Sequence, residues 1–203
     1  MDIFLHLDHY LAQLIATYGI WVYVILFAVV FLETGVVFTP FLPGDSLLFA
    51  AGTMAAVGSL NIGLLLALLA IAAITGDSMN YWIGHTFGKQ LVRFKNGRLI
   101  NQENLHKTHL FFKNHGGKSI VFARFFPIIR TFTPFVAGIA RMAYGRFVTY
   151  NVVGGIVWVT LFLLAGFFFG NIPLVKNNFT MVIMGIVVVS FLPIVLKFLS
   201  RPS

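Results

Sequence analysis

The sequence predicts an all-α integral membrane protein with four transmembrane helices, two oppositely oriented re-entrant helical hairpins and an N-terminal interfacial helix. Of the 203 residues, 59% are apolar, and the formally charged ones are 14 basic and 6 acidic, far below the roughly 25% of charged residues in a soluble domain. The mean hydropathy is +0.91. Charge-free stretches such as 46–75 and 147–175 exceed what one water-soluble core of this length buries, so lipid must be part of the solvent.

The first two predicted elements are an interfacial helix and a transmembrane helix. Residues 1–17 carry apolar residues at helical spacing but no basic face, which favours packing against the body of the protein: Ile3, Phe4, Leu7, Leu11, Leu14 and Ile15. A spanning helix follows from residue 20 and is ended by Pro40 and Pro43.

A short helix after this span predicts the first re-entrant hairpin, within segment 20–57. Asp45 is the expected N-cap of a helix from Ser46 to about residue 57. Twelve residues reach about 18 Å, well short of a hydrocarbon core of about 30 Å, so this helix must turn back inside the membrane.

The middle of the chain combines a span with a basic loop. Residues 62–84 form the second span and carry Asp77. The loop 85–118 holds half of the fourteen basic residues and a single acidic residue, Glu103, so the positive-inside bias places it in the cytoplasm. Lys197 and Arg201 place the C-terminus on the same side.

The last third of the chain repeats the pattern of span and hairpin. Residues 119–140 are apolar but interrupted by Arg124, Pro127, Arg130 and Pro134, which predicts a second re-entrant hairpin. Spans are expected at 147–170 and 179–196. Four crossings give the two hairpins opposite topology, and paired interrupted segments in two halves are typical of transporters that bind substrate near the midplane.

Four charged residues in apolar surroundings are the candidate site: Glu33, Asp45, Arg124 and Arg130. Each costs about 2.5 to 3.5 kcal/mol at the centre of a membrane helix, so they must face one another, a wet cavity or a ligand. Two buried salt bridges that only hold the hairpins together are the structural alternative. All four lie beside predicted helix breaks, which favours a functional site.

The chemistry of these residues points to phosphate and protons. Arg124 and Arg130 are predicted to bind phosphate, since guanidinium is weakly hydrated and bidentate, and a kink at Pro127 would let them converge. Glu33 and Asp45 are predicted to couple to protons, because desolvation favours a protonated carboxyl and a nearby arginine opposes it. Further residues are expected in supporting roles: Asp77, Pro43, Gly44, Pro127 and Pro134.

Other polar and aromatic patterns carry less weight. Glu103, His106 and His109 are spaced three apart among cationic neighbours and are interpreted as solvated loop residues, so no metal or cofactor site is predicted. The basic loop lacks the fold signatures of a nucleic-acid reader. Gly166 and Gly170 predict close helix packing. An aromatic belt at the membrane interface is expected for Trp21, whereas Trp82 and Trp158 fit either a belt or the interior.

Several motifs resemble the DedA family of bacterial inner-membrane proteins: Phe31-Leu-Glu33-Thr-Gly35, Phe41-Leu-Pro-Gly-Asp45-Ser-Leu-Leu48, and the stretch from Ala123 through Arg124 and Arg130 to Gly138. The resemblance implies the membrane fold of VTT-domain lipid scramblases and transport of polyprenyl phosphate or phospholipids between leaflets, linked to the proton-motive force. It also implies that Glu33 and Asp45 are the essential acidic pair and Arg124 and Arg130 the essential arginines.

The leading prediction is therefore a flippase for a lipid phosphate, either undecaprenyl phosphate or a phospholipid. Its expected partners are membrane lipids, the lipid-linked phosphate and protons, with no nucleic acid, and a homo-oligomer stays open. One alternative is a proton- or sodium-coupled exporter of small cations, which would use the same carboxylates. An integral-membrane lipid phosphatase is disfavoured, because no histidine lies within either hairpin, and a purely structural protein remains a further alternative.

Overall fold

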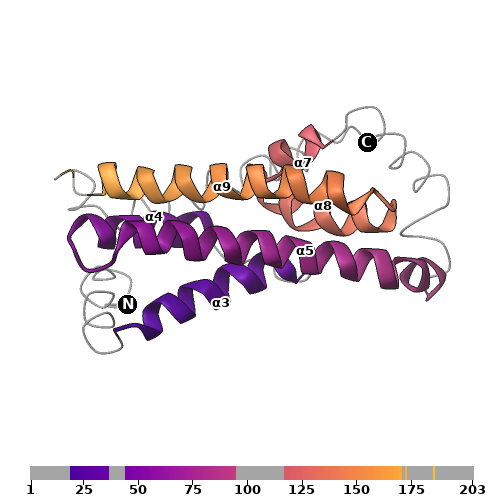
Figure 1. Cartoon of the computed structure of the whole chain (residues 1–203), viewed down its shortest axis with the longest axis horizontal. Helices are drawn as coiled ribbons and strands as arrows, with labels where there is room; N and C mark the ends of the chain where they lie inside the picture. Colours follow the sequence, from indigo (N-terminus) through magenta and orange to yellow (C-terminus); the bar gives the residue numbers. More distant parts are fainter. Residues whose placement is uncertain (1–18, 37–43, 95–116, 171, 173–184, 186–203) are drawn as a thin grey trace, which may run out of the picture. The chain divides into compact units, whose positions relative to one another are not determined.

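The computed structural model describes residues 19–36, 44–94, 117–170, 172 and 185. These residues form six helices and no strand: α3 (Trp21–Gly35), α4 (Gly44–Ala56), α5 (Ile62–Phe94), α7 (Lys118–Ala123), α8 (Pro127–Ile139) and α9 (Tyr144–Phe169) (Figure 1). The all-α prediction holds for this part of the chain. The predicted interfacial helix 1–17, most of the basic loop and the span 179–196 lie outside the described residues.

Two helices are long and apolar enough to cross a membrane, the Ile62–Phe87 part of α5 and the whole of α9. They correspond to the predicted spans 62–84 and 147–170. The helix α5 itself continues beyond the predicted span, to Phe94. Residues 85–94 were predicted as the start of the basic loop. Lysine, glutamine and arginine favour helix, and no proline interrupts this segment, so the helix continues through it.

The two segments predicted to be re-entrant hairpins contain short helices. α4 has 13 residues and begins at Gly44, so Asp45 is its second residue and the N-cap prediction is wrong by a small register error. A carboxylate there still faces the positive end of the helix dipole. In the second segment, α7 and α8 are separated by Arg124–Phe126. Pro134 lies inside α8 without ending it, contrary to the predicted interruption.

The chain forms two compact units. Unit 1 comprises residues 1–29, 42–69 and 159–203, and unit 2 comprises residues 30–41 and 70–158. The boundaries fall inside α3, α5 and α9. Unit 1 therefore contains α4, and unit 2 contains α7 and α8.

In unit 1, α4 and α9 are in backbone contact. A Cβ on Gly52 would lie 2.1 Å from the carbonyl oxygen of Leu163, and one on Gly166 would lie 2.0 Å from that of Phe49. Thr53 adds a hydrogen bond from its Oγ1 to the Gly166 carbonyl oxygen at 3.2 Å. The prediction of close helix packing at Gly166 is confirmed.

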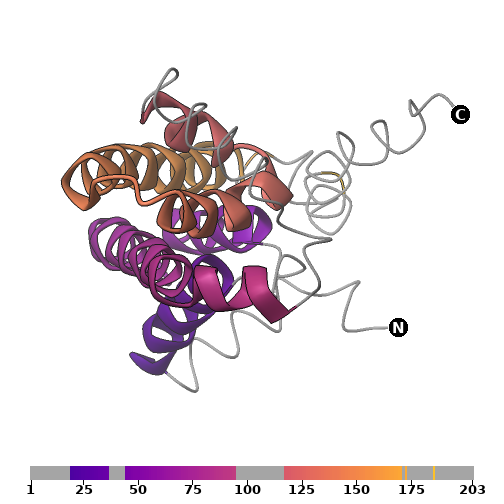
Figure 2. The same cartoon turned by 90° about the vertical axis from the view of Figure 1, so that its right-hand side faces the viewer.

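Unit 2 has an equivalent contact between α5 and α8. A Cβ on Gly84 would lie 2.1 Å from the Phe135 carbonyl oxygen, and one on Gly138 would lie 2.1 Å from that of Tyr81. α7 lies over α9 in both views (Figures 1 and 2), with Gly117 directly against the ring of Tyr150. Absence of side chains at these three glycines lets the helices of unit 2 approach closely.

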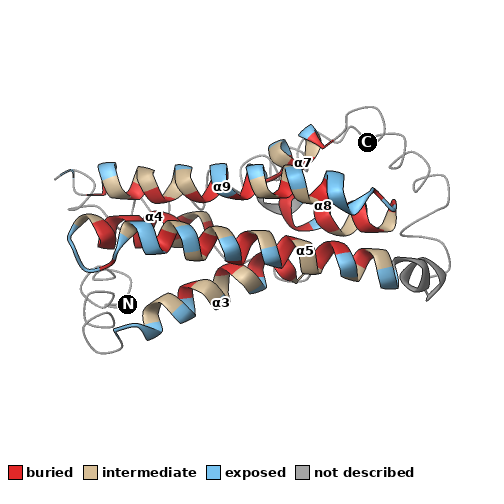
Figure 3. Ribbon diagram, viewed as in Figure 1, coloured by how far each residue is buried: buried red, intermediate tan, exposed pale blue. Residues whose placement is uncertain are grey.

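Burial divides the long helices into two faces. Figure 3 shows buried residues along one side of α5 and α9 and exposed residues along the other. The exposed side of α9 is apolar and includes Val153, Ile156, Val157 and Leu161. An apolar outer face is what a helix presents to lipid, whereas in water it would be an unusually large exposed patch.

Helices α4 and α8 end in the same hydrogen-bond pattern. Ser59 N donates to the Met54 carbonyl and Met142 N to the Ala137 carbonyl, the six-to-one bond of a Schellman motif. The left-handed residue of that motif is Gly58 with φ 80° after α4, but Arg141 with φ 52° after α8. A left-handed conformation costs a residue with a side chain about 1 to 2 kcal/mol.

Candidate functional site

Arg130 and Glu33 form a buried ion pair in unit 2. Arg130 lies in the first turn of α8 and donates from Nη2 to Glu33 Oε1, in the last turn of α3. Their side chains are only 3% and 2% exposed. The Arg130 guanidinium carbon also lies 4.5 Å from the ring centroid of the buried Trp158, so a cation–π contact covers the arginine from α9.

Arg124 forms the second buried ion pair of the same unit. It is the C-cap of α7, where the negative end of the helix dipole favours a cation. Its Nη2 donates to Asp77 Oδ2 on α5 and to Asn151 Oδ1 on α9, and both members of the ion pair are 2% exposed. Asp77, expected only in a supporting role, is thus the direct counter-ion of Arg124.

Asn151 fixes the oxygen that Arg124 contacts. Its Nδ2 donates to the Ile74 carbonyl oxygen at 3.0 Å and to Ser78 Oγ at 3.3 Å. Because both amide hydrogens point to α5, the amide oxygen faces the arginine. The side chain of Asn151 is therefore an oriented acceptor rather than a free rotor.

Two glycines of α9 provide the space for the Arg124 side chain. A Cβ on Gly154 would lie 3.0 Å from Arg124 Cδ, and one on Gly155 would lie 3.5 Å from its Nη1. The Arg124 side chain thus lies against the buried backbone of α9 at these two glycines. A larger residue at Gly154 would force the arginine to move.

Asn80 brings the two ion pairs into one neighbourhood. Its Nδ2 donates to the Thr34 carbonyl oxygen at 3.1 Å and to the Thr131 carbonyl oxygen at 2.8 Å, the residues that directly follow Glu33 and Arg130. Asn80 is three residues after Asp77 on α5, so the two share one face of the helix, with Cβ atoms about 5 to 6 Å apart. Both ion pairs therefore adjoin the same stretch of α5.

The first turn of α8 adds positive potential next to Arg130. Phe126, the residue before the helix, provides no side-chain cap, so the first amide groups of α8 receive no acceptor from it. Pro134 has no N–H with which to bond the Arg130 carbonyl four residues earlier. The helix start and the arginine together favour an anion.

Several buried polar atoms of the site have no hydrogen-bond partner within the part of the chain that the structure describes: Arg124 Nε and Nη1, Asp77 Oδ1 and Asn80 Oδ1. Buried polar atoms without partners are uncommon in native proteins and call for water or a ligand. Donors and acceptors both remain in this group. The site therefore has capacity for a polar molecule beyond the bonds described above.

The remaining predicted site residues are distributed as follows. Asp45 lies half-buried in α4 of unit 1, and Gly44 is the first residue of that helix. Pro127 is the first residue of α8. Pro43 lies outside the described residues. Glu103, His106 and His109, which were interpreted as solvated loop residues, also lie outside them, and within the described ones no group of three potential metal ligands occurs.

Asn80 and Asn151 were not predicted as site residues. Both are completely buried and both occupy apolar spans, where an amide side chain needs partners as a charge does. Their position in the predicted spans was a usable signal. Both side chains are neutral, so a pattern of charged residues does not include them.

Comparison with known proteins identifies the family. The VTT domain model matches residues 42–168. The chain belongs to the VTT-domain, or DedA, family. It is 52% identical to Protein DedA of Escherichia coli K12 over 203 residues, covering 99% of this chain and 93% of that protein. No solved structure matches the chain.

More distant relatives in the family are also named as membrane proteins. An uncharacterized membrane protein of Mycobacterium leprae is 42% identical over 165 residues, covering 81% of this chain and 74% of that protein. Inner membrane protein YqjA of E. coli K12 is 33% identical over 155 residues, covering 74% and 69%. These relatives and the two apolar helices of spanning length together indicate that the chain is a membrane protein.

Proposed function

We propose that this chain moves a lipid phosphate, undecaprenyl phosphate or a phospholipid, between the leaflets of the bacterial inner membrane. The observation that carries the proposal is the pair of buried arginines, Arg124 and Arg130, each held by a carboxylate of unit 2. Two buried guanidinium groups beside the same stretch of α5 suit a group with several negative oxygens. A lipid keeps its tails in the bilayer while its phosphate reaches such a site.

Binding proceeds by exchange of ion-pair partners. A phosphate offers the same bidentate acceptor geometry as a carboxylate, so it competes with Asp77 for Arg124 and with Glu33 for Arg130. Arg124 already has two nitrogens without partners in the described part of the chain. These donors are available to a first phosphate oxygen before the ion pair with Asp77 breaks.

Protons are coupled to this exchange through the carboxylates. Protonation of Glu33 removes its negative charge and weakens its hold on Arg130, which frees the guanidinium for phosphate. Asp77 has the same relationship to Arg124, and Asp45 is proposed as a further coupling residue in α4. Proton uptake on one side and release on the other would then drive the cycle.

Reconstituted vesicles that contain only this protein provide the test. The probes are a fluorescent phosphatidylglycerol and, separately, undecaprenyl phosphate, and the readout is the rate at which each lipid changes leaflet. Arg124→Lys and Arg130→Lys keep the charge but lose bidentate geometry, so we expect at least a tenfold loss. Lys118→Arg, at an exposed position, is the matched control with a wild-type rate.

Charge-neutral double variants separate function from structure. Arg124→Gln with Asp77→Asn, and Arg130→Gln with Glu33→Gln, remove each ion pair completely. If the pairs bind phosphate, these variants fold but do not flip lipid. Wild-type flipping in both double variants would overturn the proposal and leave the ion pairs a structural role.

A further inference from the structure

The turn between α8 and α9 holds an arginine where a glycine would be less strained. Arg141 occupies the left-handed position of the Schellman motif, with φ 52°, and the same position after α4 is taken by Gly58. Glycine is the usual residue there because it has no Cβ. A strained residue that persists indicates that its side chain has a use.

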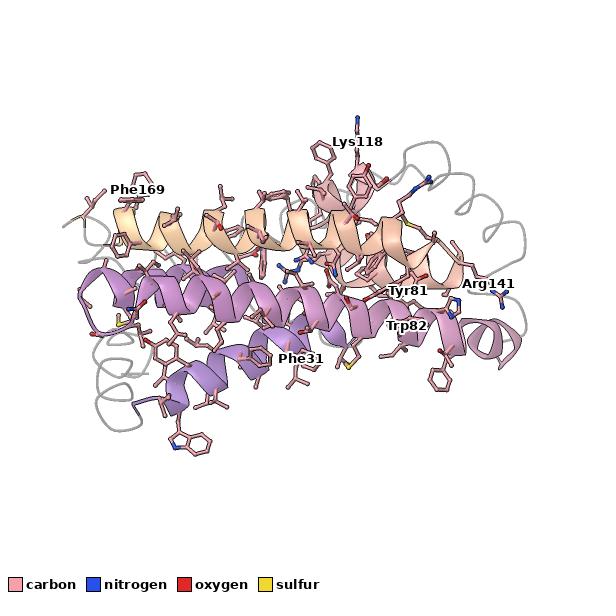
Figure 4. All side chains as sticks on the ribbon, in the orientation of Figure 1. Phe31, Tyr81, Trp82, Lys118, Arg141 and Phe169 are labelled. Atoms are coloured by element: carbon pink, nitrogen blue, oxygen red, sulfur yellow. The ribbon has the colours of Figure 1, made fainter. Side chains whose placement is uncertain are left out.

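The backbone of this turn is fixed from within unit 2. Tyr81 donates from its hydroxyl to the Met142 carbonyl oxygen, and its ring stacks on Phe147 at a centroid distance of 4.6 Å. Met142 itself is buried in one cluster with Ala137 and Tyr81. Because Met142 is held inward, Arg141 must project outward, as Figure 4 shows at the end of the helices.

The surface around Arg141 combines cations with half-exposed aromatic rings. Arg141 and Arg146 are both exposed, and the rings of Trp82 and Tyr144 lie 5.4 Å apart by their centroids. Trp82 is 48% and Tyr144 38% exposed. We call these four residues the turn patch.

The turn patch lies where two membrane-spanning helices end. The apolar span of α9 begins at Tyr144, and that of α5 ends at Phe87, little more than one turn after Trp82. Tryptophan and tyrosine at such ends occupy the level of the lipid head groups. Arginine at the same level meets lipid phosphates.

Charge complementarity selects the kind of lipid. The three acidic residues within the described part of the chain, Glu33, Asp45 and Asp77, are buried or half-buried, so that part has no exposed carboxylate to pair with Arg141 or Arg146. Zwitterionic head groups carry their own ammonium and compensate a guanidinium less well than anionic ones.

We propose that the turn patch binds the head groups of anionic phospholipids, with Arg141 as its central contact. The bidentate guanidinium binds the phosphate, and Trp82 and Tyr144 flank it at the interface. This site is separate from the buried ion pairs of Arg124 and Arg130, and it does not depend on the transport proposed above.

The test compares wild type with Arg141→Gly in the full-length protein. Thermal unfolding is measured in detergent alone, with added phosphatidylglycerol, and with phosphatidylcholine at the same mole fraction; native mass spectrometry counts the bound lipids. Arg141→Gly should raise the unfolding temperature in detergent alone, because the strain is relieved. It should also lose at least half of the extra rise that phosphatidylglycerol gives over phosphatidylcholine.

Further variants keep the test decisive. Arg141→Asn tolerates the left-handed conformation without the flexibility of glycine and should lose the phosphatidylglycerol effect equally. Lys118→Ala removes another exposed cation outside the turn patch and should keep the wild-type effect. The proposal would be overturned if both Arg141 variants kept the full phosphatidylglycerol effect and bound as many lipids as wild type. It would also be overturned if Lys118→Ala lost as much of the phosphatidylglycerol effect as the Arg141 variants.

Discussion

Glu33 in the last turn of α3 and Arg130 in the first turn of α8 are ion partners although 97 residues separate them in the chain. Each is buried, so each depends on the other to offset the cost of a charge outside water. The second pair, Arg124 and Asp77, has the same dependence over 47 residues. The partners are therefore specific, and this specificity is measurable.

Partner specificity leads to the first prediction. Arg130→Ala removes the arginine that pairs with the buried Glu33 carboxylate and should destabilise the protein by about 3 to 5 kcal/mol. Adding Glu33→Gln should recover much of this loss, whereas adding Asp77→Asn should not. Thermal unfolding in detergent measures the stability of each variant. At Arg124 we expect the reverse pattern, in which Asp77→Asn rescues Arg124→Ala and Glu33→Gln does not. Equal rescue by either carboxylate variant would contradict the pairing.

The second prediction concerns Asn151. Asn151→Leu keeps the size of the side chain but removes the acceptor of Arg124 and the donor to Ile74. The buried groups left without hydrogen bonds should lower the stability by about 1 to 3 kcal/mol. Thr149→Ala, two residues earlier and exposed, should change stability by less than about 0.5 kcal/mol. Chemical unfolding in mixed micelles compares the two. A neutral Asn151→Leu would show that the amide does not orient the arginine.

The contact between α5 and α8 gives the third prediction. Gly84→Ala and Gly138→Ala each place a methyl group about 2 Å from a backbone oxygen of the other helix, and such overpacking costs about 1 to 3 kcal/mol or more. Gly145→Ala, in the first turn of α9 with nothing within 4 Å of the new methyl, should instead stabilise by about 0.4 to 1 kcal/mol. Unfolding temperatures of the three variants decide this, and a harmless Gly138→Ala would contradict the close approach.

Proton coupling is the fourth prediction. Glu33→Gln and Asp45→Asn keep the shape of the side chain but cannot ionise, so lipid flipping should lose its dependence on a pH gradient across the vesicle membrane. Thr133→Ala, at a half-buried position in α8, should keep it. Flipping rates with and without a gradient are the measurement. Wild-type pH dependence in both carboxyl variants would remove these residues from coupling.

Topology is the fifth prediction. The chain has no cysteine, so single cysteines at Lys95 and Lys176 report their own side of the membrane. A membrane-impermeant thiol reagent applied to intact spheroplasts should label position 176 and leave position 95 unlabelled until the cells are opened. Labelling of position 95 in intact spheroplasts would reverse the orientation expected from the basic loop.

Much of the helical part could be predicted because membrane helices follow local rules. The lengths of the apolar stretches predicted α5 and α9, and proline predicted the break between α7 and α8. The end of α5 at Phe94 was missed, because positive charge marks the side of the membrane and says nothing of where a helix stops. Pro134 was misread for a related reason, since neighbouring helices can support a proline inside a membrane helix.

The site could be predicted as a set of residues but not as pairs. Intramembrane charge singled out Glu33, Arg124 and Arg130, and their burial agrees with that argument. The assignment of Arg124 to Asp77 depends on which faces of α5 and α7 meet, and this depends on glycines that let helices approach. Sequence spacing holds no information on such contacts between distant segments.

The order of the ion partners along the chain has a consequence for biosynthesis. Glu33 and Asp77 are synthesised 97 and 47 residues before the arginines that they pair with. At about 5 to 20 residues per second, Glu33 waits about 5 to 20 s for Arg130. During that interval the Glu33 carboxyl group on the nascent helix α3 lacks Arg130, and the protonated form is the one that hydrocarbon tolerates. Early insertion of this membrane protein thus requires either a bound proton or a wet environment, until α8 emerges and supplies the positive charge.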